Sequence, residues 1–465
     1  MTAYPNMKAS GVSWVAAMPA HWEMKRMRES FSFRKGLSIT KANLEARGIP
    51  VISYGQVHSK SNSGVGLCEK LLRFVNPSYL DTSANALVAK NDFIFADTSE
   101  DLAGCGNCAF IDSDKYPIFA GYHSVIAHPL LNGNIKYLAY LFQSESWRHQ
   151  IREKVNAVKV YSITQKILKD IFLLLPPTDE QDQIVRFLDW KVSGINRLIN
   201  IKKKEIARLG ELKKTIVNEA VTHGINPNIP MKSSGVEWLG DIPEHWNTLK
   251  LKRISKERKE KQLYTPNTTD KYIGLENIKR DSEQLIITKS EYDKSIQNFC
   301  HKGDLLFGKL RPYLSKVIVC PYDSCCTNEL LVLYSFAGNI HFLRYVMVSK
   351  SFIQIVDSST YGAKMPRANT NYIMNMFVPL PPIEEQNLIV KYLNKQIGRI
   401  DSIIDRVIKQ ISLLQELKAR LISDVATGQL DVRNIEVPKY EYVEENSDAD
   451  PDSDDESEDV TDEED

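Results

Sequence analysis

The chain has 465 residues, and its 59 Lys and Arg residues balance 59 Asp and Glu residues, so the formal net charge is zero. The stretch from Glu441 to the C-terminus contains 15 acidic residues and no Lys or Arg, which leaves the rest of the chain with a net charge of +15. A basic body with an acidic appendage is typical of proteins that bind nucleic acid or another polyanion.

The composition is that of a soluble globular protein. Hydrophobic residues make up 43% and charged residues 25%, and the length predicts about three domains. No apolar run approaches the roughly 18 residues of a membrane span, and the N-terminus lacks the features of a secretory signal. Seven cysteines, an odd number, favour a reducing compartment. We therefore expect a cytoplasmic protein without a membrane span.

Short sequence islands in the first half of the chain recur in the same order in the second half. Residues 10–22 match 234–246 at an offset of 224, and the offset falls to 205 where residues 175–181 match 380–386. Such collinear islands indicate a tandem duplication whose second copy is shorter. The ends of the copies match well and the interiors match only in part. The two copies therefore share a common framework, which we call the frame, and differ in the interior sequence that it encloses. Between these islands, residues 51–57 match 272–278 and residues 90–95 match 302–307.

The duplication divides the chain into five segments. In chain order these are a globular domain over residues 1–177, a long helix over 178–223, a second globular domain over 224–382 that starts with a linker at 224–233, a second long helix over 383–428 and a C-terminal extension over 429–465.

Both long helices are predicted from apolar residues that recur in steps of three and four, which is the pattern of a coiled-coil seam. Two acidic residues follow each Pro-Pro pair and suit a helix N-terminus, and Gly224 and Gly428 mark the ends. Lys213 and Lys418 occupy equivalent seam positions and are expected to fix the register. Two copies in one chain can pair in antiparallel fashion, whereas the alternative is a stalk for dimerisation.

The C-terminal extension ends in an acidic tail without apolar periodicity, and we expect this tail to be disordered. One interpretation is that it only makes the protein more soluble. The other is that it competes weakly with DNA for basic surfaces, which would favour the correct sites over nonspecific ones.

The sequence resembles the specificity (S) subunit of Type I restriction-modification systems, from about residue 10 to about residue 433. No single motif decides this resemblance, but the order and the duplication of the motifs are specific. The acidic tail departs from the family pattern. The motifs are residues 243–246 (Pro-Glu-His-Trp), 272–278, 303–313, 364–367 and 95–101, together with the two Leu-Pro-Pro-x-x-Glu-Gln segments.

The resemblance implies a non-catalytic reader of DNA. Its fold would be mixed α/β, with two target-recognition domains in tandem and two long antiparallel helices that clamp them. Each domain would read one half of a split double-stranded target, and the helices would set the gap. Two modification (methyltransferase) subunits would dock on the helices and bring S-adenosylmethionine for adenine methylation. Restriction subunits, which translocate DNA with ATP and Mg²⁺, would join for cleavage.

Candidate DNA contacts are basic or aromatic residues in the differing interiors of the two copies. In the second copy Lys309, Arg311 and Tyr313 lie on one short segment, and Lys364 and Arg367 lie on another. We predict that both segments contact DNA. The alternative is that each lysine is only a solvated surface residue.

In the first copy, Lys159 and Tyr161 align with the second of these segments at an offset of 205. The lysine shared by both copies, Lys159 and Lys364, suggests a phosphate contact in place of base choice. Ser99 and the two acidic residues after it are candidates to accept hydrogen bonds from base amino groups. Their alternative use is to cap a turn.

We predict no catalytic, cofactor or metal site in the chain itself. Residues 303–310 match a phosphate-binding loop except at the last position, where Leu310 replaces Ser or Thr, and Pro312 disfavours the helix that should follow. Cys105 and Cys108 form a single Cys-x-x-Cys motif, which has metal-ligand spacing but lacks the two further ligands of a structural zinc site. The rival functions are a coiled-coil scaffold that reads no sequence and a stand-alone nuclease or methylase.

Overall fold

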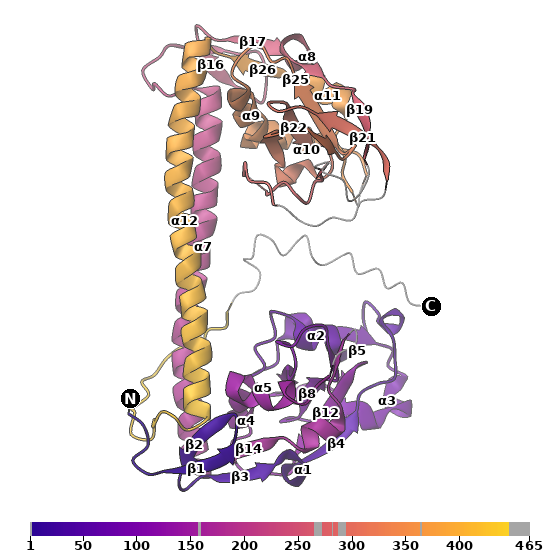
Figure 1. Cartoon of the computed structure of the whole chain (residues 1–465), viewed down its shortest axis with the longest axis vertical. Coiled ribbons are helices and arrows are strands. Elements are labelled where there is room, and N and C mark those ends of the chain that lie inside the picture. The colour runs from indigo at the N-terminus through magenta and orange to yellow at the C-terminus, as the bar shows by residue number, and fades with distance from the viewer. Residues whose placement is uncertain are drawn as a thin grey trace. The chain divides into compact units, whose positions relative to one another are not determined.

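The computed structural model describes residues 2–156, 160–264, 272–280, 282–286, 294–362 and 365–445. The chain forms two compact units: unit 1 comprises residues 1–205 and 407–465, and unit 2 comprises residues 206–406. Each unit combines several small β-sheets with short helices and with part of each of two long helices (Figure 1). This arrangement confirms the expected mixed α/β class with two tandem domains.

The two long helices are α7 (Thr178–Thr222) and α12 (Ile383–Ala426). Each begins directly after a Pro-Pro pair with two acidic residues in its first turn, where carboxylates stabilise the exposed N–H groups and the positive end of the helix dipole. Gly224 and Gly428 follow the two helices with positive φ angles of 76° and 71°, a backbone conformation that glycine adopts without strain.

Unit 1 is built around two four-stranded sheets. The central strand β8 (Phe93–Ala96) is buried along its whole length, because both of its faces are covered: Phe93 and Phe95 belong to one hydrophobic cluster, and Ile94 and Ala96 to another. Its sequence is accordingly apolar throughout. The first sheet has the order β10 (Cys108–Phe110), β8, β12 (Ser124–Pro129), β4 (Phe31–Lys35), and the second has the order β6 (Arg73–Val75), β5 (Ile49–Ile52), β11 (Ile118–Ala120), β7 (Leu87–Val88).

The described residues of unit 1 also form three strand pairs and six short α-helices. The pairs are β1 (Met7–Val12) with β2 (Val15–Pro19), β3 (Glu23–Arg26) with β14 (Phe172–Leu175), and β9 (Thr98–Ser99) with β13 (Tyr161–Ser162). The helices are α1 (Met27–Ser30), α2 (Tyr54–His58), α3 (Tyr79–Thr82), α4 (Lys136–Gln143), α5 (Glu145–Arg152) and α6 (Gln165–Lys169).

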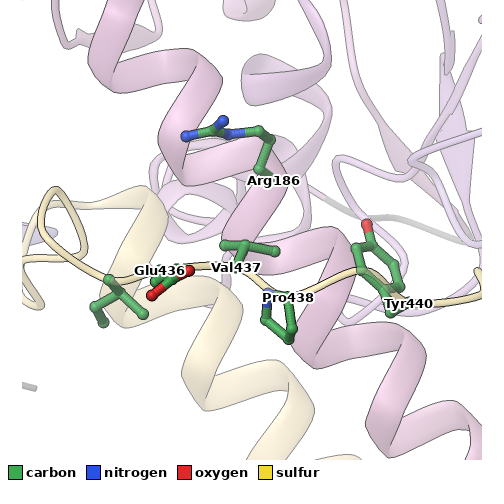
Figure 2. Close-up of a pocket in the computed structure, with 6 residues that line it drawn as sticks. Arg186, Glu436, Val437, Pro438 and Tyr440 are labelled. Carbon is green, nitrogen blue, oxygen red and sulfur yellow. The ribbon is translucent and has the colours of Figure 1, made fainter.

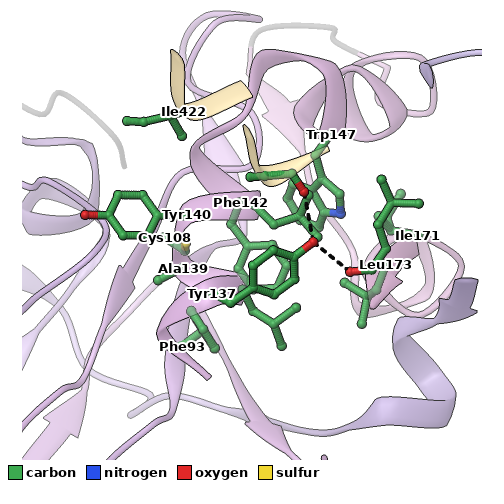
Figure 3. Close-up of a cluster of buried hydrophobic side chains, with 14 of the residues drawn as sticks. Phe93, Cys108, Tyr137, Ala139, Tyr140, Phe142, Trp147, Ile171, Leu173 and Ile422 are labelled. Atoms are coloured by element: carbon green, nitrogen blue, oxygen red, sulfur yellow. Dashed lines mark hydrogen bonds between the residues drawn. The ribbon is translucent and has the colours of Figure 1, made fainter. Parts of the chain in front are cut away.

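The core of unit 1 is rich in aromatic residues and includes the C-terminal end of α12 (Figure 3). The ring of Phe142 lies 4.4 Å from that of Trp147 and 4.8 Å from that of Phe93, measured between centroids, and such pairs add to the burial of their area. The hydroxyl of the buried Tyr137 donates to the carbonyl oxygens of Leu174 at 3.0 Å and of Ala426 at 2.8 Å. Residues far apart in the sequence therefore build one core.

Unit 2 repeats this architecture. Its first sheet has the order β18 (Lys256–Glu257), β25 (Leu330–Tyr334), β22 (Leu305–Gly308), β23 (Val317–Val319), and its second has the order β19 (Lys261–Tyr264), β21 (Ser295–Cys300), β24 (Ser324–Cys326), β20 (Tyr272–Ile273). The strand pairs are β15 (Met231–Ser233) with β16 (Asp241–Pro243) and β17 (Asn247–Lys250) with β26 (Phe377–Leu380). The short helices are α8 (Leu251–Ile254), α9 (Ile340–Val348), α10 (Lys350–Ser358) and α11 (Thr370–Asn375).

The repeated sequence motifs meet in space and form a clamp at the start of each long helix. In unit 1, the Nε1 atom of Trp22 donates to Glu180 at 3.0 Å, and the Nε2 atom of His21 lies 2.7 Å from the same carboxylate. In unit 2, Trp246 and the histidine before it make the same two contacts with Glu385, at 3.0 and 2.7 Å. The Pro-x-His-Trp and Glu-Gln motifs therefore act together to fix the domain on its helix.

A second repeated contact lies at the start of the central strand of each unit. The guanidinium of Arg34 pairs with the buried Asp92 at 3.2 Å in unit 1, and that of Arg258 pairs with the buried Asp304 at 2.6 Å in unit 2. Breaking a buried pair leaves a charge without a partner, which is strongly unfavourable. These ion pairs therefore explain why an aspartate precedes the central strand in both copies.

The lysines of the predicted helix seam find partners on the other long helix. Lys213 of α7 donates to Asp401 of α12 at 2.9 Å in unit 2, and Lys418 of α12 donates to Asn196 of α7 at 3.2 Å in unit 1. The partners, like the lysines, are 205 residues apart. The equivalent contacts agree with the expected role of the lysines in register, while the coiled-coil packing itself stays a prediction.

Among the residues that the structure describes, no helix combines the length and the apolar character that a membrane crossing requires. After α12 the chain passes close to the N-terminus, where the N–H of Asp431 donates to the carbonyl of Thr2 at 2.9 Å. It then continues along α7 as far as Glu445. The acidic tail from residue 446 onward lies outside the described residues, so its disorder stays a prediction.

Candidate nucleic-acid interface

In unit 2 the segment that follows the central strand β22 pairs with a segment far along the chain. The N–H of Arg311 donates to the carbonyl of Pro366 at 2.8 Å, and the N–H of Ala368 donates to the carbonyl of Lys309 at 2.8 Å. Leu310 and Arg367 face each other in an isolated β-bridge. The two segments that the sequence singled out separately are therefore joined in one surface, which we call the basic site.

A carboxylate holds the basic site together. The guanidinium of Arg367 pairs with Glu329 at 2.9 Å, and the backbone carbonyl of Glu329 accepts a hydrogen bond from the N–H of Lys309 at 2.9 Å. Burial and the charge of Arg367 lower the pKa of Lys309, against the opposing effect of Glu329. Glu329 was missed by sequence reasoning, because an isolated glutamate before a strand gives no signal of the residue that it will contact.

Aromatic and apolar side chains surround the basic site. The side chains of Tyr313, Tyr361 and Met365 are large and exposed, at 44%, 61% and 57%. Arg311 adopts a left-handed conformation with φ of 49°, which is uncommon for a non-glycine residue and clusters at functional sites. Exposed aromatic rings beside cations are the composition with which proteins contact bases and phosphates together.

Unit 1 has the same backbone arrangement at the equivalent place. The N–H of Ile163 donates to the carbonyl of Asp97 at 2.7 Å, as Ala368 does to Lys309, and the N–H of Asp97 donates to the carbonyl of His123 at 3.1 Å, as Lys309 does to Glu329. Tyr161 and Ser99 are opposite each other in the pairing of β13 with β9. We call this surface the acidic site.

The side chains of the acidic site differ from those of unit 2. The hydroxyl of Tyr54 donates to Glu100 at 3.3 Å, and burial and the charge of Glu100 raise the pKa of Tyr54 to about 12. The Nδ1 atom of His123 lies 3.3 Å from Asp97, and the Tyr54 and His123 rings are 6.3 Å apart between centroids. Neither Tyr54 nor His123 was predicted for this site, because both come from segments distant in sequence.

The predicted residues of the first copy are placed differently from one another. Tyr161 is partly exposed beside the acidic site. Ser99 is only 2% exposed, and its hydroxyl donates to the carbonyl of Asp101 at 2.7 Å, so it fits the alternative of a turn cap. Lys159 and Lys364, the lysines shared by the two copies, lie outside the described residues.

The motifs weighed as sites of chemistry are structural where the chain is described. Residues 303–310 contain β22 and lead into a short 3₁₀ turn at Pro312–Leu314, where a phosphate loop would lead into an α-helix. Cys105 and Cys108 are buried, and burial raises the pKa of Cys108 to about 12. Within the described residues, no group of three or more His, Cys, Asp or Glu side chains is placed to hold a metal ion.

Comparison with known proteins identifies the duplicated frame. The sequence matches the family described as the Type I restriction modification DNA specificity domain over residues 19–208 and again over residues 243–413. The chain belongs to this family. The two matched ranges correspond to the two copies, so each copy is one specificity domain with its helix.

Two curated relatives match the chain over most of their own length. The Type I restriction enzyme MjaVIII specificity subunit of Methanocaldococcus jannaschii is 25% identical over 313 residues, which cover 64% of this chain and 71% of the relative. A second relative from that organism, the MjaX specificity subunit, is 23% identical over 433 residues, which cover 90% of this chain and 96% of the relative. A chain from a structural study of assembly and conformational transition in the type I R-M system has a TM-score of 0.60 at 15% identity, over 89% of this chain and 99% of that one. This last likeness shows the shared fold.

The family assignment settles the broad function. The protein is a specificity subunit of a Type I restriction-modification system, and it recognises the DNA target sequence. Specificity subunits are non-catalytic components of these complexes, and the sequence analysis likewise assigned no catalytic residues to this chain. The rival interpretation, a scaffold that reads no sequence, is therefore wrong.

Proposed function

We propose that each unit of this specificity subunit reads one half of a split double-stranded DNA target. The observation that carries the proposal is the duplicated frame: the clamp, the buried ion pair and the backbone of the reading surface recur in both units, whereas the side chains on that surface do not. A frame that is kept while its surface changes is what two readers of different half-sites require. Because mismatches cost about 1–3 kcal/mol each and add roughly, two readers in one chain multiply the specificity.

In unit 2 the reading groups are hydrogen-bond donors. Arginine guanidinium groups match the O6 and N7 acceptors of guanine in the major groove, and Glu329 fixes the orientation of Arg367. We assign Arg311 and Arg367 to base contacts, Lys309 to a phosphate and Tyr313 to a ring contact with base or sugar. Lys364, on the adjoining segment, is proposed to contact a phosphate.

In unit 1 the exposed groups are mainly acceptors. Glu100 and Asp101 are exposed at the acidic site, and carboxylates accept hydrogen bonds from the amino group of cytosine. Tyr161 lies beside them, and Lys159 is proposed to contact a phosphate as Lys364 does. Unit 1 would therefore prefer a different half-site from unit 2.

The long helices are proposed to form an antiparallel spacer that sets the gap between the half-sites. The contacts that support this lie between Asn196 and Lys418 and between Lys213 and Asp401: the residue number rises by 17 along α7 as it falls by 17 along α12. For readers that face one side of the duplex, the half-sites would be about 34 Å apart. Deleting one heptad from each helix should change the tolerated gap, and an unchanged gap would remove the spacer role.

The chemistry of modification and cleavage is proposed to belong to partner subunits. Two modification subunits would dock on the helices and bind S-adenosylmethionine, and restriction subunits would use ATP and Mg²⁺. The purified chain alone should neither methylate DNA nor hydrolyse ATP. Mapping methylated adenines in a host that has this chain and its partners should yield a motif of two fixed parts with an unread gap. A continuous motif would contradict the proposal.

A further inference from the structure

The loop between β9 and β10 in unit 1 exposes a leucine beside two carboxylates. Residues 100–107, which we call the reading loop, connect these strands. Glu100 and Asp101 are exposed, and the next side chain, Leu102, is large, apolar and 43% exposed. A single exposed leucine needs no explanation by itself. Here, however, the backbone that carries the leucine is held in place by several contacts.

Hydrogen bonds within the reading loop fix the shape of its tip. The N–H of Gly104 donates to the Oδ1 atom of Asp101 at 2.6 Å, and the carbonyl of Asp101 accepts from the hydroxyl of Ser99 at 2.7 Å. The N–H of Cys105 donates to the carbonyl of Leu102 at 3.3 Å. The tip is therefore a turn whose shape is set before any DNA is bound.

Neighbouring elements of unit 1 hold the reading loop from outside. The guanidinium of Arg152, at the end of α5, donates to the carbonyl of Ala103 at 2.7 Å. A Cβ atom on Gly104 would lie only 3.0 Å from the Cε1 atom of His58, so glycine permits the loop to lie this close to α2. Cys108, where the loop enters β10, is buried in the core. The loop is thus fixed at its tip and at its end.

The carboxylate of Glu100 is also oriented. The hydroxyl of Tyr54 donates to its Oε1 atom at 3.3 Å, and the ring of Tyr54 lies 4.7 Å from that of His58, measured between centroids. The Oε2 atom of the carboxylate can accept a further hydrogen bond. A fixed acceptor two residues before a fixed apolar side chain matches a base with an amino group close to a thymine, whose C5-methyl group projects into the major groove.

Unit 2 also exposes a large side chain at the equivalent place. Because Asp97 of unit 1 corresponds to Lys309 of unit 2, the tip of the reading loop corresponds to Tyr313 and its neighbours. The side chain of Tyr313 is 44% exposed. Both copies thus present one large side chain after the central strand, aromatic in unit 2 and aliphatic in unit 1. A place that is kept while its chemistry changes favours base recognition over chance exposure.

We propose that Leu102 determines specificity in unit 1 by contacting the C5-methyl group of a thymine, close to the base whose amino group donates to Glu100. The inference rests on the proposed function, in that unit 1 reads one half-site. Two residues of chain span at most about 7 Å and successive bases lie about 3.4 Å apart, which places the thymine about two base pairs or fewer from the base that Glu100 reads. A loop that is already rigid binds without the cost of ordering it, so one methyl contact contributes to affinity.

The test uses the full chain and duplex DNA that contains the target mapped from methylated adenines. Each thymine is replaced in turn by deoxyuridine, which keeps the hydrogen-bonding groups and lacks only the C5-methyl group, and fluorescence anisotropy measures the affinity. In the half-site that Glu100→Gln relaxes, one replacement should weaken binding of the unchanged chain by about threefold to fivefold, the size expected for one buried methyl group. Leu102→Ala should weaken binding to the thymine target by a similar factor, and the same replacement should then have no further effect.

Two exposed side chains elsewhere in unit 1 provide matched controls. Leu130 is 63% exposed and follows β12, at the opposite end of that strand from His123. Tyr440 is 40% exposed and lines a pocket with Arg186 of α7 (Figure 2). Leu130→Ala and Tyr440→Ala should bind the thymine target like the unchanged chain and keep its sensitivity to deoxyuridine. The unfolding midpoint serves as the folding control, and the deoxyuridine series on the unchanged chain requires no variant at all.

Three results would overturn the inference. They are a target in which no deoxyuridine weakens binding, a loss that is the same in Leu102→Ala as in the unchanged chain, and a Leu102→Ala variant that binds DNA normally but binds a modification subunit more weakly. The last result would assign the side chain to a protein contact. A target that is not split, or a Glu100→Gln variant that relaxes neither half, would instead contradict the proposed function itself.

Discussion

The acidic site of unit 1 and the basic site of unit 2 share a backbone and differ in charge. The residue after the central strand is Asp97 in unit 1 and Lys309 in unit 2. In both units its N–H donates to one neighbouring segment, and its carbonyl accepts a hydrogen bond from another. At the equivalent place beside it, unit 1 has His123 where unit 2 has Glu329. The side-chain contacts therefore differ, with His123 beside Asp97 in unit 1 and Glu329 paired with Arg367 in unit 2, while the hydrogen bonds of the main chain are retained.

This difference separates the contacts that the fold requires from the side chains that determine which bases a domain recognises. Backbone hydrogen bonds must be satisfied whatever the DNA sequence is, so the frame tolerates little change. Exposed side chains are free to change because their substitution costs little stability. Residues that differ at a fixed frame position are therefore the best candidates for the choice of bases. The predictions below test the frame first and the surface afterwards.

The largest expected effect comes from breaking the clamp. Glu180 is 4% exposed and accepts from Trp22 and from the hydroxyl of Tyr4, so Glu180→Ala leaves buried donors unpaired and should lower the free energy of unfolding by about 3 kcal/mol. The Glu385 side chain is 18% exposed, so Glu385→Ala should lower the free energy of unfolding by less, about 1–2 kcal/mol. Urea unfolding measures both, with the corresponding Glu→Gln variants as controls. Equal and small losses would show that the clamp does not hold the frame.

The next effect concerns the basic site. Arg367→Ala should weaken binding to the cognate target by about 1–3 kcal/mol and leave binding to unrelated DNA nearly unchanged. Glu329→Gln should have a smaller effect of the same kind, because it loosens the guanidinium without removing it. Fluorescence anisotropy with cognate and scrambled half-sites measures the ratio. Equal weakening on all sequences would reassign Arg367 to a phosphate.

A smaller effect is expected from the pH dependence of Lys309. Its pKa is lowered by burial and by Arg367, so its charge is lost at a lower pH than that of an ordinary lysine, and DNA affinity should fall as pH rises toward about 10. Lys309→Arg keeps its charge over this range and should remove the dependence. The change is measured by anisotropy at constant ionic strength. A fall of the same size in Lys309→Arg would assign the effect to another group.

The smallest effect is expected from the tail. Deleting residues 446–465 removes acidic residues but keeps residues 441–445, which contact α7. The deletion should tighten nonspecific DNA binding modestly at low salt and not at high salt. An affinity that stays the same at low salt would leave the tail with a role in solubility alone.

The duplication and the two long helices were predictable because their signals are local or periodic. The steps of three and four indicate two long helices, the Pro-Pro pairs and the glycines indicate where they begin and end, and the repeated motifs predict two copies of one fold. In unit 2 the sequence also singled out Lys309, Arg311 and Arg367, because basic residues were dense there.

The pairing within each site could not be predicted, because it depends on contacts between distant residues. The sequence gives no signal that Arg367 meets Glu329 or that Tyr54 meets Glu100. Ser99 shows the same limit. Its hydroxyl is a candidate DNA contact in the sequence, yet the side chain is buried and its hydroxyl donates to the carbonyl of Asp101. The contact between the start of the acidic tail and α7 was missed for a related reason. The tail from Glu441 was treated as one segment, whereas its first five residues, 441–445, contact α7.

The most direct test of two independent readers is to map methylated adenines in three otherwise identical strains that have the partner subunits with the unchanged chain, Arg367→Ala or Glu100→Gln. The account predicts a split motif in the first strain, relaxation of one half only with Arg367→Ala, and relaxation of the other half only with Glu100→Gln. Relaxation of the same half in both variants, or a motif without two parts, would contradict it.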